Sequence, residues 1–542
     1  MRRICIVMVA LLLCRSVSSA ETVFKPVIPV SHADSLVKFS HSGNYSVSGG
    51  KFGNLYEFTP YDPLRIKPYE QEKLPSLYAR FGIQMPVAPS ASVGFNKSFS
   101  EKFAFNVSGS HDSYLSGFPV YGSGEKRMDN TVRTGLKYVW DAGELSFGLK
   151  YDYSTCEFDE PELQPASFHS SGNFGIRAGI CSTKKDDGDL YYKFNVDFNT
   201  LKAGSESCGD DLSLTENAFH ITGYAGTNFD VHRVYVDMDM QIASYKGTRD
   251  YTAMVVQFSP LYEYKCKRFA GKFGVTFGNR FGNSTVYKQT RMEDGNDISA
   301  VSSVFPNVDA RVEAVRNYLW AHLAVGGGYE MNSYSSLSGN CILLSPDTRL
   351  RMGQCPVDVS LALESVISGR FSANISGRYK LTDNKPLISP VVERADGENA
   401  SLSRIRAWDV NMSSFVFSTE VMWKSESFLI GGEVKCFANT SSTGETVTEL
   451  PSFTSKAYLR YNWRHRIVFS ADFNYIGPTS GTKWGYYEVP SIRDMNLGIT
   501  YHLKHNLSIF AKFRNLLNAE NQYMPLYAEQ GLNIGGGVIL TL

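Results

Sequence analysis

Residues 192–199 read Tyr-Lys-Phe-Asn-Val-Asp-Phe-Asn, a strict alternation of apolar and polar side chains. A β-strand places successive side chains on opposite faces, so this stretch has one apolar face and one polar face. Four further runs with the same period cover residues 234–242, 371–381, 467–475 and 495–503. The repeated period of two predicts an all-β protein.

The alternation persists from residue 77 to residue 542. Its runs approach the ~9–11 residues that a tilted strand needs to cross a bilayer. Short connections such as residues 464–466 join them in pairs. A sheet of hairpins in lipid must close, because an open edge leaves backbone groups unpaired. We therefore predict an antiparallel transmembrane β-barrel of about 22 strands over residues 77–542; a soluble secreted β-protein is the alternative.

The N-terminus has the features of an export signal. Arg2 and Arg3 precede an apolar run, and small residues follow as far as Ala20. This order predicts a signal peptide over residues 1–20 that is cleaved after Ala20. Residues 21–76 contain several prolines and no sustained period. We expect this irregular N-terminal segment to lie outside the regular sheet, in the barrel lumen.

Composition also favours a barrel. Aromatic residues make up 13% of the chain, including 31 Tyr and 34 Phe, and barrels use such residues where their walls meet the lipid headgroups. The mean hydropathy of −0.21 fits a barrel too, because polar lumen residues offset the apolar outer face. The net charge is zero, so we do not expect nucleic acid as a partner. The barrel prediction makes outer-membrane lipid an expected partner.

The C-terminal residues 533–542 form the clearest local signal. Val538, Leu540 and Leu542 share one face of a predicted strand, and the chain stops on that face. A final strand whose last residue faces lipid is typical of the signals that the barrel-assembly machinery reads. The sequence therefore predicts insertion into the outer membrane of a Gram-negative bacterium.

Two segments resemble a known family. Residues 507–518 (LSIFAKFRNLLN), the Tyr523–Tyr527 segment and the strand over 531–542 resemble the last strands of a TonB-dependent receptor. Residues 74–94 (LPSLYARFGIQMPVAPSASVG) look like the first strand of plug-less, receptor-like barrels of Bacteroidetes. Ordinary family members carry a plug domain ahead of the barrel, and residues 21–76 are too few to form one. The resemblance therefore implies a receptor-type wall without a plug.

No catalytic, cofactor-binding or metal-ligand pattern stands out in the sequence. The ten His residues are dispersed, and we expect His502, on the polar face of a strand, to be a hydrogen-bonded wall residue. Arg378, Lys380, Asp237 and Asp239 lie on polar faces and are expected to line the lumen. Both signs are present, so no ion preference follows.

Seven cysteines remain once Cys5 and Cys14 leave with the signal peptide. They show no CxxC or zinc-type spacing. Their pairing is open, and a hairpin-loop disulfide such as Cys341–Cys355 is one possibility.

We therefore expect a non-enzymatic outer-membrane barrel that acts in uptake or in surface binding of an unknown ligand. Because an empty barrel of this size would be a wide pore, we expect the long loops and the N-terminal segment to fill its lumen. Longer polar intervals, among them residues 200–215 and 382–408, predict such loops. The alternatives are a general porin-like channel and, from another class, an outer-membrane enzyme. The enzyme would show a His paired with a Ser, Asp or Glu at one rim of the barrel.

Overall fold

The computed structural model describes most of the chain from residue 76 onward. The described residues are 76–542 without 86, 116–125, 159–166, 184–187, 208–209, 248–249, 283–299, 340, 349, 368–369, 394–400, 465, 525–526 and 529–530.

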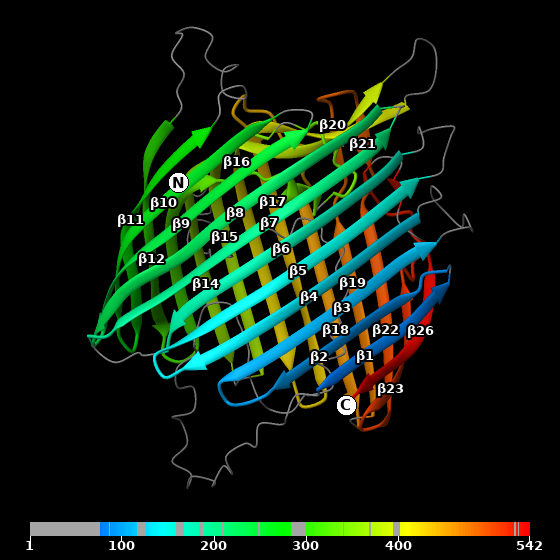
Figure 1. Cartoon of the computed structure of the whole chain (residues 1–542), viewed down its shortest axis with the longest axis horizontal. Coiled ribbons are helices and arrows are strands. Elements are labelled where there is room, and N and C mark those ends of the chain that lie inside the picture. Colours follow the sequence, from blue (N-terminus) through cyan, green and yellow to red (C-terminus); the bar gives the residue numbers. More distant parts are fainter. Residues whose placement is uncertain are drawn as a thin grey trace, which may run out of the picture.

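The fold is a closed antiparallel barrel of 22 strands (Figure 1), which confirms the predicted fold class. Each wall strand pairs with the next wall strand along the chain, across the short strands of two connections. The first wall strand pairs with the last, where Phe81 lies opposite Val538. The wall strands are β1 (Leu77–Met85), β2 (Ser90–Ser98), β3 (Phe103–Leu115), β4 (Lys126–Trp140), β5 (Gly143–Phe158), β6 (Ser167–Ser182), β7 (Leu190–Ser207), β8 (Asp210–Phe229), β9 (His232–Gly247), β10 (Tyr251–Lys265), β11 (Phe269–Gly282), β12 (Ala300–Val315), β13 (Leu319–Glu330), β14 (Gly353–Ile367), β15 (Phe371–Glu393), β16 (Ser401–Lys424), β17 (Phe428–Ser441), β18 (Phe453–Trp463), β19 (Ile467–Ile476), β22 (Ile492–Lys504), β23 (Leu507–Arg514) and β26 (Asn533–Thr541).

Four shorter strands and one helix lie in the connections. The strands are β20 (Thr479–Gly481), β21 (Tyr487–Val489), β24 (Gln522–Met524) and β25 (Tyr527–Ala528), and the helix is α3 (Tyr334–Ser338). Among the described residues, no helix is long and apolar enough to span a membrane.

The alternation in the sequence decides which side chains face outward. In β7, Phe198 is exposed on the outer surface, and its neighbours Asp197 and Asn199 lie on the other face, toward the lumen. The same rule exposes Val234 and Val236 of β9 on the outer surface. An outer face of exposed apolar side chains is what a barrel wall needs in lipid.

The two ends of the barrel differ. Tight turns at residues 141–142 and 230–231 lie at the end that holds the C-terminus, which we call the turn end (Figure 1). The opposite end, which we call the loop end, holds the longer connections. Residues 200–215 and 382–408 are not the predicted loops, because most of them belong to strands that continue past the membrane-spanning length. Backbone pairing extends them, and polar composition does not stop a ladder whose backbone groups are all bonded.

The cysteines form no disulfide within the described part of the chain. Cys181, Cys266, Cys341, Cys355 and Cys436 are free thiols, and no disulfide joins Cys156 to any of them. The suggested Cys341–Cys355 pair is therefore wrong. Cys341 packs near Cys156 in one hydrophobic cluster, whereas the Cys355 thiol donates to the backbone of its own strand.

Candidate functional site: a loop across the barrel mouth

The inner face of the wall carries charged side chains that pair across neighbouring strands. Arg378 of β15 donates through Nε to Asp358 of β14 at 2.7 Å, and Lys380 of β15 pairs with Glu330 of β13. This arrangement confirms that Arg378 and Lys380 face the lumen. Because each cation has a carboxylate partner, the two residues do not form a ring of one sign.

Histidines on the inner wall also have hydrogen-bond partners. His502 Nδ1 lies 2.8 Å from Ser508 Oγ near the turn end, and His220 Nε2 lies 3.0 Å from Asp239. Asp237 occupies the same face as Asp239, as predicted. Ser508 is buried, so its hydroxyl is closed to a substrate. His502 is a hydrogen-bonded wall residue, in agreement with the prediction.

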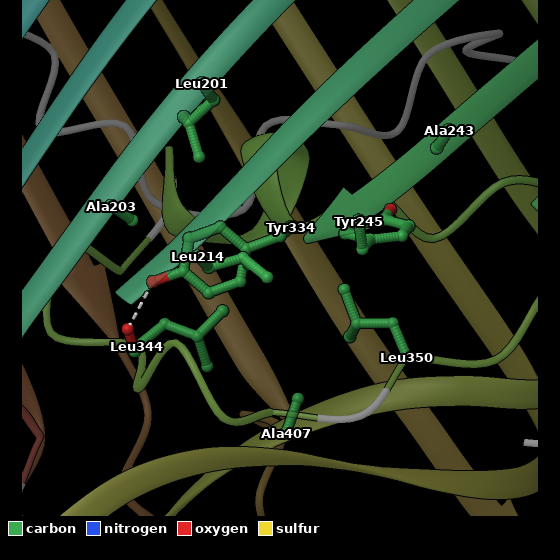
Figure 2. Close-up of a cluster of buried hydrophobic side chains, with 9 residues drawn as sticks. All are labelled: Leu201, Ala203, Leu214, Ala243, Tyr245, Tyr334, Leu344, Leu350 and Ala407. Atoms are coloured by element: carbon green, nitrogen blue, oxygen red, sulfur yellow. Dashed lines mark hydrogen bonds between the residues drawn. The ribbon is translucent and has the colours of Figure 1, made fainter. Parts of the chain in front are cut away.

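The connection between β13 and β14, residues 331–352, folds back into the barrel, and we call it the inserted loop. It contains α3, whose N-terminus is capped by Ser333. The Tyr334 hydroxyl donates to the carbonyl of Leu344 at 2.6 Å (Figure 2). This bond closes the loop on itself and gives the hydroxyl of a buried tyrosine a partner, as buried polar groups require.

One side of the inserted loop packs on the inner wall. The contact is a cluster of buried apolar side chains from β7, β8 and β9 on one side and from the loop on the other (Figure 2). Burial of such surface stabilises a contact by about 25 cal/mol per Å². The buried members are Leu201, Ala203, Leu214, Ala243 and Tyr245 of the wall, Tyr334, Leu344 and Leu350 of the loop, and Ala407 of β16.

A carboxylate fixes this side of the loop in place. Glu216 of β8 is 1% exposed and accepts hydrogen bonds from the Ser335 backbone N–H, at 3.1 Å, and from the Ser335 hydroxyl. A buried carboxylate is unfavourable unless donors surround it. The two donors of Ser335 meet that requirement and join the start of α3 to the wall.

The other side of the inserted loop meets the extended part of β16. The Ser345 backbone N–H donates to the Ile405 carbonyl at 2.8 Å, and Asp347 pairs with Arg404 at 3.3 Å and with Arg406. Burial raises the pKa of Asp347, but hydrogen bonds from Arg406 and Ser345 and the charge of Arg404 outweigh that effect. The pKa of Asp347 therefore lies below its usual value, and its carboxylate is charged at neutral pH.

These contacts carry the inserted loop across the barrel. Cys156 of β5, Leu343 of the loop and Ile405 of β16 belong to one hydrophobic cluster. From β5 to β16 is eleven steps around a ring of 22 strands, which is half of the circumference. The outer part of β16 and the inserted loop therefore cross the mouth from one wall to the opposite wall.

Two further connections, residues 442–452 and 477–491, contact the extended hairpin of β15 and β16. Leu387 and Met412 pack with Val447 of the connection 442–452. Tyr487 of β21, at the rim of the loop end (Figure 1), lies within hydrogen-bond distance of Ser389, with 3.4 Å between the hydroxyl oxygens. Several segments thus contact one another at the mouth, and we call them the cap: the inserted loop, the outer parts of β15 and β16, and residues 442–452 and 477–491.

The predicted insertion signal lies at the seam of the barrel. Val538 and Leu542 are exposed on the outer face, and Leu540 shares that face on β26, which pairs with β1 and β23. Recognition of this strand by the assembly machinery stays a prediction. The predicted cleavage position, Ala20, lies outside the described residues.

The sequence did not predict the inserted loop. In the described part of the chain, no group of three or more side chains is placed to bind a metal ion.

Solved structures with similar barrels are transporters and receptors. No protein-family profile and no curated protein matches the sequence. The copper transporter OprC superposes with a TM-score of 0.64 at 10% identity, over 87% of this chain and 81% of that chain. The FrpB iron transporter from Neisseria meningitidis gives 0.65 at 8% identity, over 87% and 82%. The ferric enterobactin receptor PfeA from Pseudomonas aeruginosa, in a mutant form, gives 0.63 at 11% identity, over 87% and 81%.

These similarities concern the fold. The barrel wall of this chain is similar in fold to the walls of these transporters and receptors, which agrees with the predicted receptor-type wall. The residues described here contain no plug domain.

Proposed function

We propose that this protein is an outer-membrane barrel of the receptor or transporter type that takes up or binds a ligand at its loop end. The mouth is closed in the resting state by the cap. The cluster that joins β5, the inserted loop and β16 carries this proposal, because it crosses the mouth. An open barrel of this strand number would be a wide pore, and a closed mouth removes that hazard.

The proposal extends to the N-terminal segment. After cleavage at Ala20, residues 21–76 precede β1, which begins at the turn end. We propose that they lie in the lumen beneath the cap. The polar, paired inner wall supports this, because a segment without a regular sheet needs polar partners there.

Conductance of the mature protein in a planar bilayer tests the closed mouth. We expect little steady current from the wild type. A large steady current should follow when residues 333–351 are replaced by a short Gly-Ser link. Replacing the exposed turn 266–268 at the turn end by a Gly-Ser link provides the control and should leave the barrel closed. Removal of residues 21–76 alone measures how much the N-terminal segment contributes to blocking the current.

A large, steady current from the wild-type barrel would overturn the closed-mouth proposal. That result would favour a porin-like channel, in which the inserted loop narrows the pore without sealing it.

A further inference from the structure

Three polar side chains on β3 and β4 are joined in a defined order. His111 Nδ1 lies 2.8 Å from Asn130 Oδ1, and His111 Nε2 lies 3.2 Å from Ser113 Oγ. An amide oxygen can only accept, so the proton of the imidazole is on Nδ1 and points at Asn130. Nε2 is then free to accept from the Ser113 hydroxyl, whose other neighbour is the Pro89 carbonyl at the longer distance of 3.4 Å.

This set lies on the outer surface of the barrel. His111 and Ser113 are two residues apart on β3 and therefore share a face with Leu115, which is 53% exposed. Asn130 is the register partner of His111 on β4 and shares its face with Val132, which is 48% exposed. The intervening residue of β3 points into the lumen.

The height of the set on the wall matters as well. β3 runs from the turn end to Leu115 at the loop end, so His111 and Ser113 lie in its last third. Tyr153 of the next strand lies opposite Asn130, and tyrosines gather where the wall meets the headgroup region. The position of the set beside Tyr153 and near the loop end agrees with the depth of the acyl ester groups in the outer leaflet.

An ionisable side chain on the lipid-facing surface of a membrane-spanning segment is a candidate functional residue. All three side chains are partly buried by their neighbours, so they are held in place but remain accessible. A Ser–His–Asn set is recognised by its geometry and not by its place in a sequence. The nucleophile, the base and the group that orients the base are all present in the right order.

We propose that Ser113, His111 and Asn130 hydrolyse an acyl ester of membrane lipid at the outer surface of the barrel. This activity is independent of the cap and of the proposed uptake. The substrate is a lipid of the surrounding bilayer, so its ester carbonyl reaches Ser113 directly from the membrane.

The reaction proceeds in two halves. Ser113 Oγ attacks the ester carbonyl while His111 Nε2 takes its proton, and that proton then passes to the departing alcohol oxygen as the ester bond breaks. The acyl group is now bound to Ser113. Water attacks this second ester, His111 Nε2 takes a proton from the water, and that proton returns to Ser113 as the fatty acid leaves. Asn130 positions the imidazole throughout.

The test uses full-length mature protein in vesicles of phosphatidylethanolamine and phosphatidylglycerol. We expect release of free fatty acid and covalent labelling of Ser113 by a fluorophosphonate probe, located by mass spectrometry. Ser113→Ala and His111→Ala should each lower hydrolysis by about 100-fold or more. Ser110→Ala changes a lumen-facing serine of the same strand and should match the wild type.

Asn130 needs a separate readout because it acts through His111. Asn130→Ala should lower hydrolysis, and Asn130→Asp should restore it with the acidic limb of the pH–rate profile moved to higher pH, because a carboxylate stabilises the protonated imidazole. Faster migration of the unheated protein on a gel shows that each variant is folded. A folded wild type that releases no fatty acid and takes up no probe overturns the proposal, as does activity that survives Ser113→Ala.

Discussion

Glu216 of β8 and Ser335 of α3 are 119 residues apart in the chain, yet Ser335 donates two hydrogen bonds to the Glu216 carboxylate. One residue belongs to the barrel wall and the other to the inserted loop. Their contact links the two, and Glu216 is buried. It therefore offers a direct way to loosen the cap without changing the wall strands.

The change Glu216→Ala should open the mouth part of the time. It leaves the N–H of Ser335 without its acceptor and leaves the Ser335 hydroxyl only Ser333 Oγ, at 3.2 Å, which weakens the closed form by about 1–3 kcal/mol. Since about 1.4 kcal/mol is a factor of ten, the open fraction in single-channel records should rise by about tenfold or more. Glu216→Gln, which keeps one acceptor oxygen, should give a smaller rise.

Ser335→Ala completes a double-mutant cycle with Glu216→Ala. If the two residues act through their contact, the free-energy effect of the double variant on opening should be smaller than the sum of the two single effects. Fully additive effects, or a closed Glu216→Ala barrel, would contradict the role of this contact.

Acid should also loosen the cap, through Asp347. Its pKa is lowered below the ordinary 3.8 by its arginine and serine partners in spite of burial. The folded form thus gains stability from the charged carboxylate above the unfolded pKa, and loses it as pH falls through the lower folded pKa. Open events should become frequent only below about pH 4. Asp347→Asn should open more often at neutral pH and lose this acid dependence.

The sequence predicts the barrel well because the wall obeys a simple rule. Each residue of a strand such as β7 faces either lipid or lumen, so the alternation over residues 192–199 is visible without the structure. The cap escapes that rule. Residues 341–344 (Cys-Ile-Leu-Leu) are apolar because they pack inside the mouth, and their composition looks like a short strand. A loop that packs inside the barrel therefore lacks the polar composition by which a loop is recognised in a sequence.

The outer-surface set shows a second limit of sequence analysis. His111 and Ser113 have the spacing of two that places them on one face, which is visible in the sequence. Asn130 comes from the next strand and joins them only through the register of β3 with β4. Register depends on the pairing of whole strands, so the third member could not be assigned from one sequence.

Cysteine accessibility should report the orientation of the barrel. Cys266 is exposed in the connection between β10 and β11 at the turn end. A membrane-impermeant maleimide on intact cells should therefore leave Cys266 unlabelled, and should label it once the outer membrane is permeabilised. Glu445→Cys, at an exposed position of the cap, should be labelled in intact cells. Peptide-resolved mass spectrometry reads each site.

Cys436 supplies an internal control for the lipid-facing surface. It is exposed and shares the outer face of β17 with Val434. It should resist the polar maleimide under both conditions and react with a lipid-soluble one. Labelling of Cys266 in intact cells would reverse the orientation that the proposed function needs.

A charge on the outer face of the last strand should show how deep each position lies in the membrane. Val538 pairs with Phe81 and Ile509 within the wall, and Leu542 ends the chain at the turn end. Lys on the lipid face of a barrel costs about 2–4 kcal/mol at the bilayer midplane and about 0–1 kcal/mol near the interface. In urea unfolding from lipid vesicles, Val538→Lys should therefore destabilise the barrel by clearly more than Leu542→Lys does. The two positions differ in depth because they are four residues apart along the strand. An equal loss of unfolding free energy in both variants would therefore mean that β26 does not cross the hydrocarbon at this register.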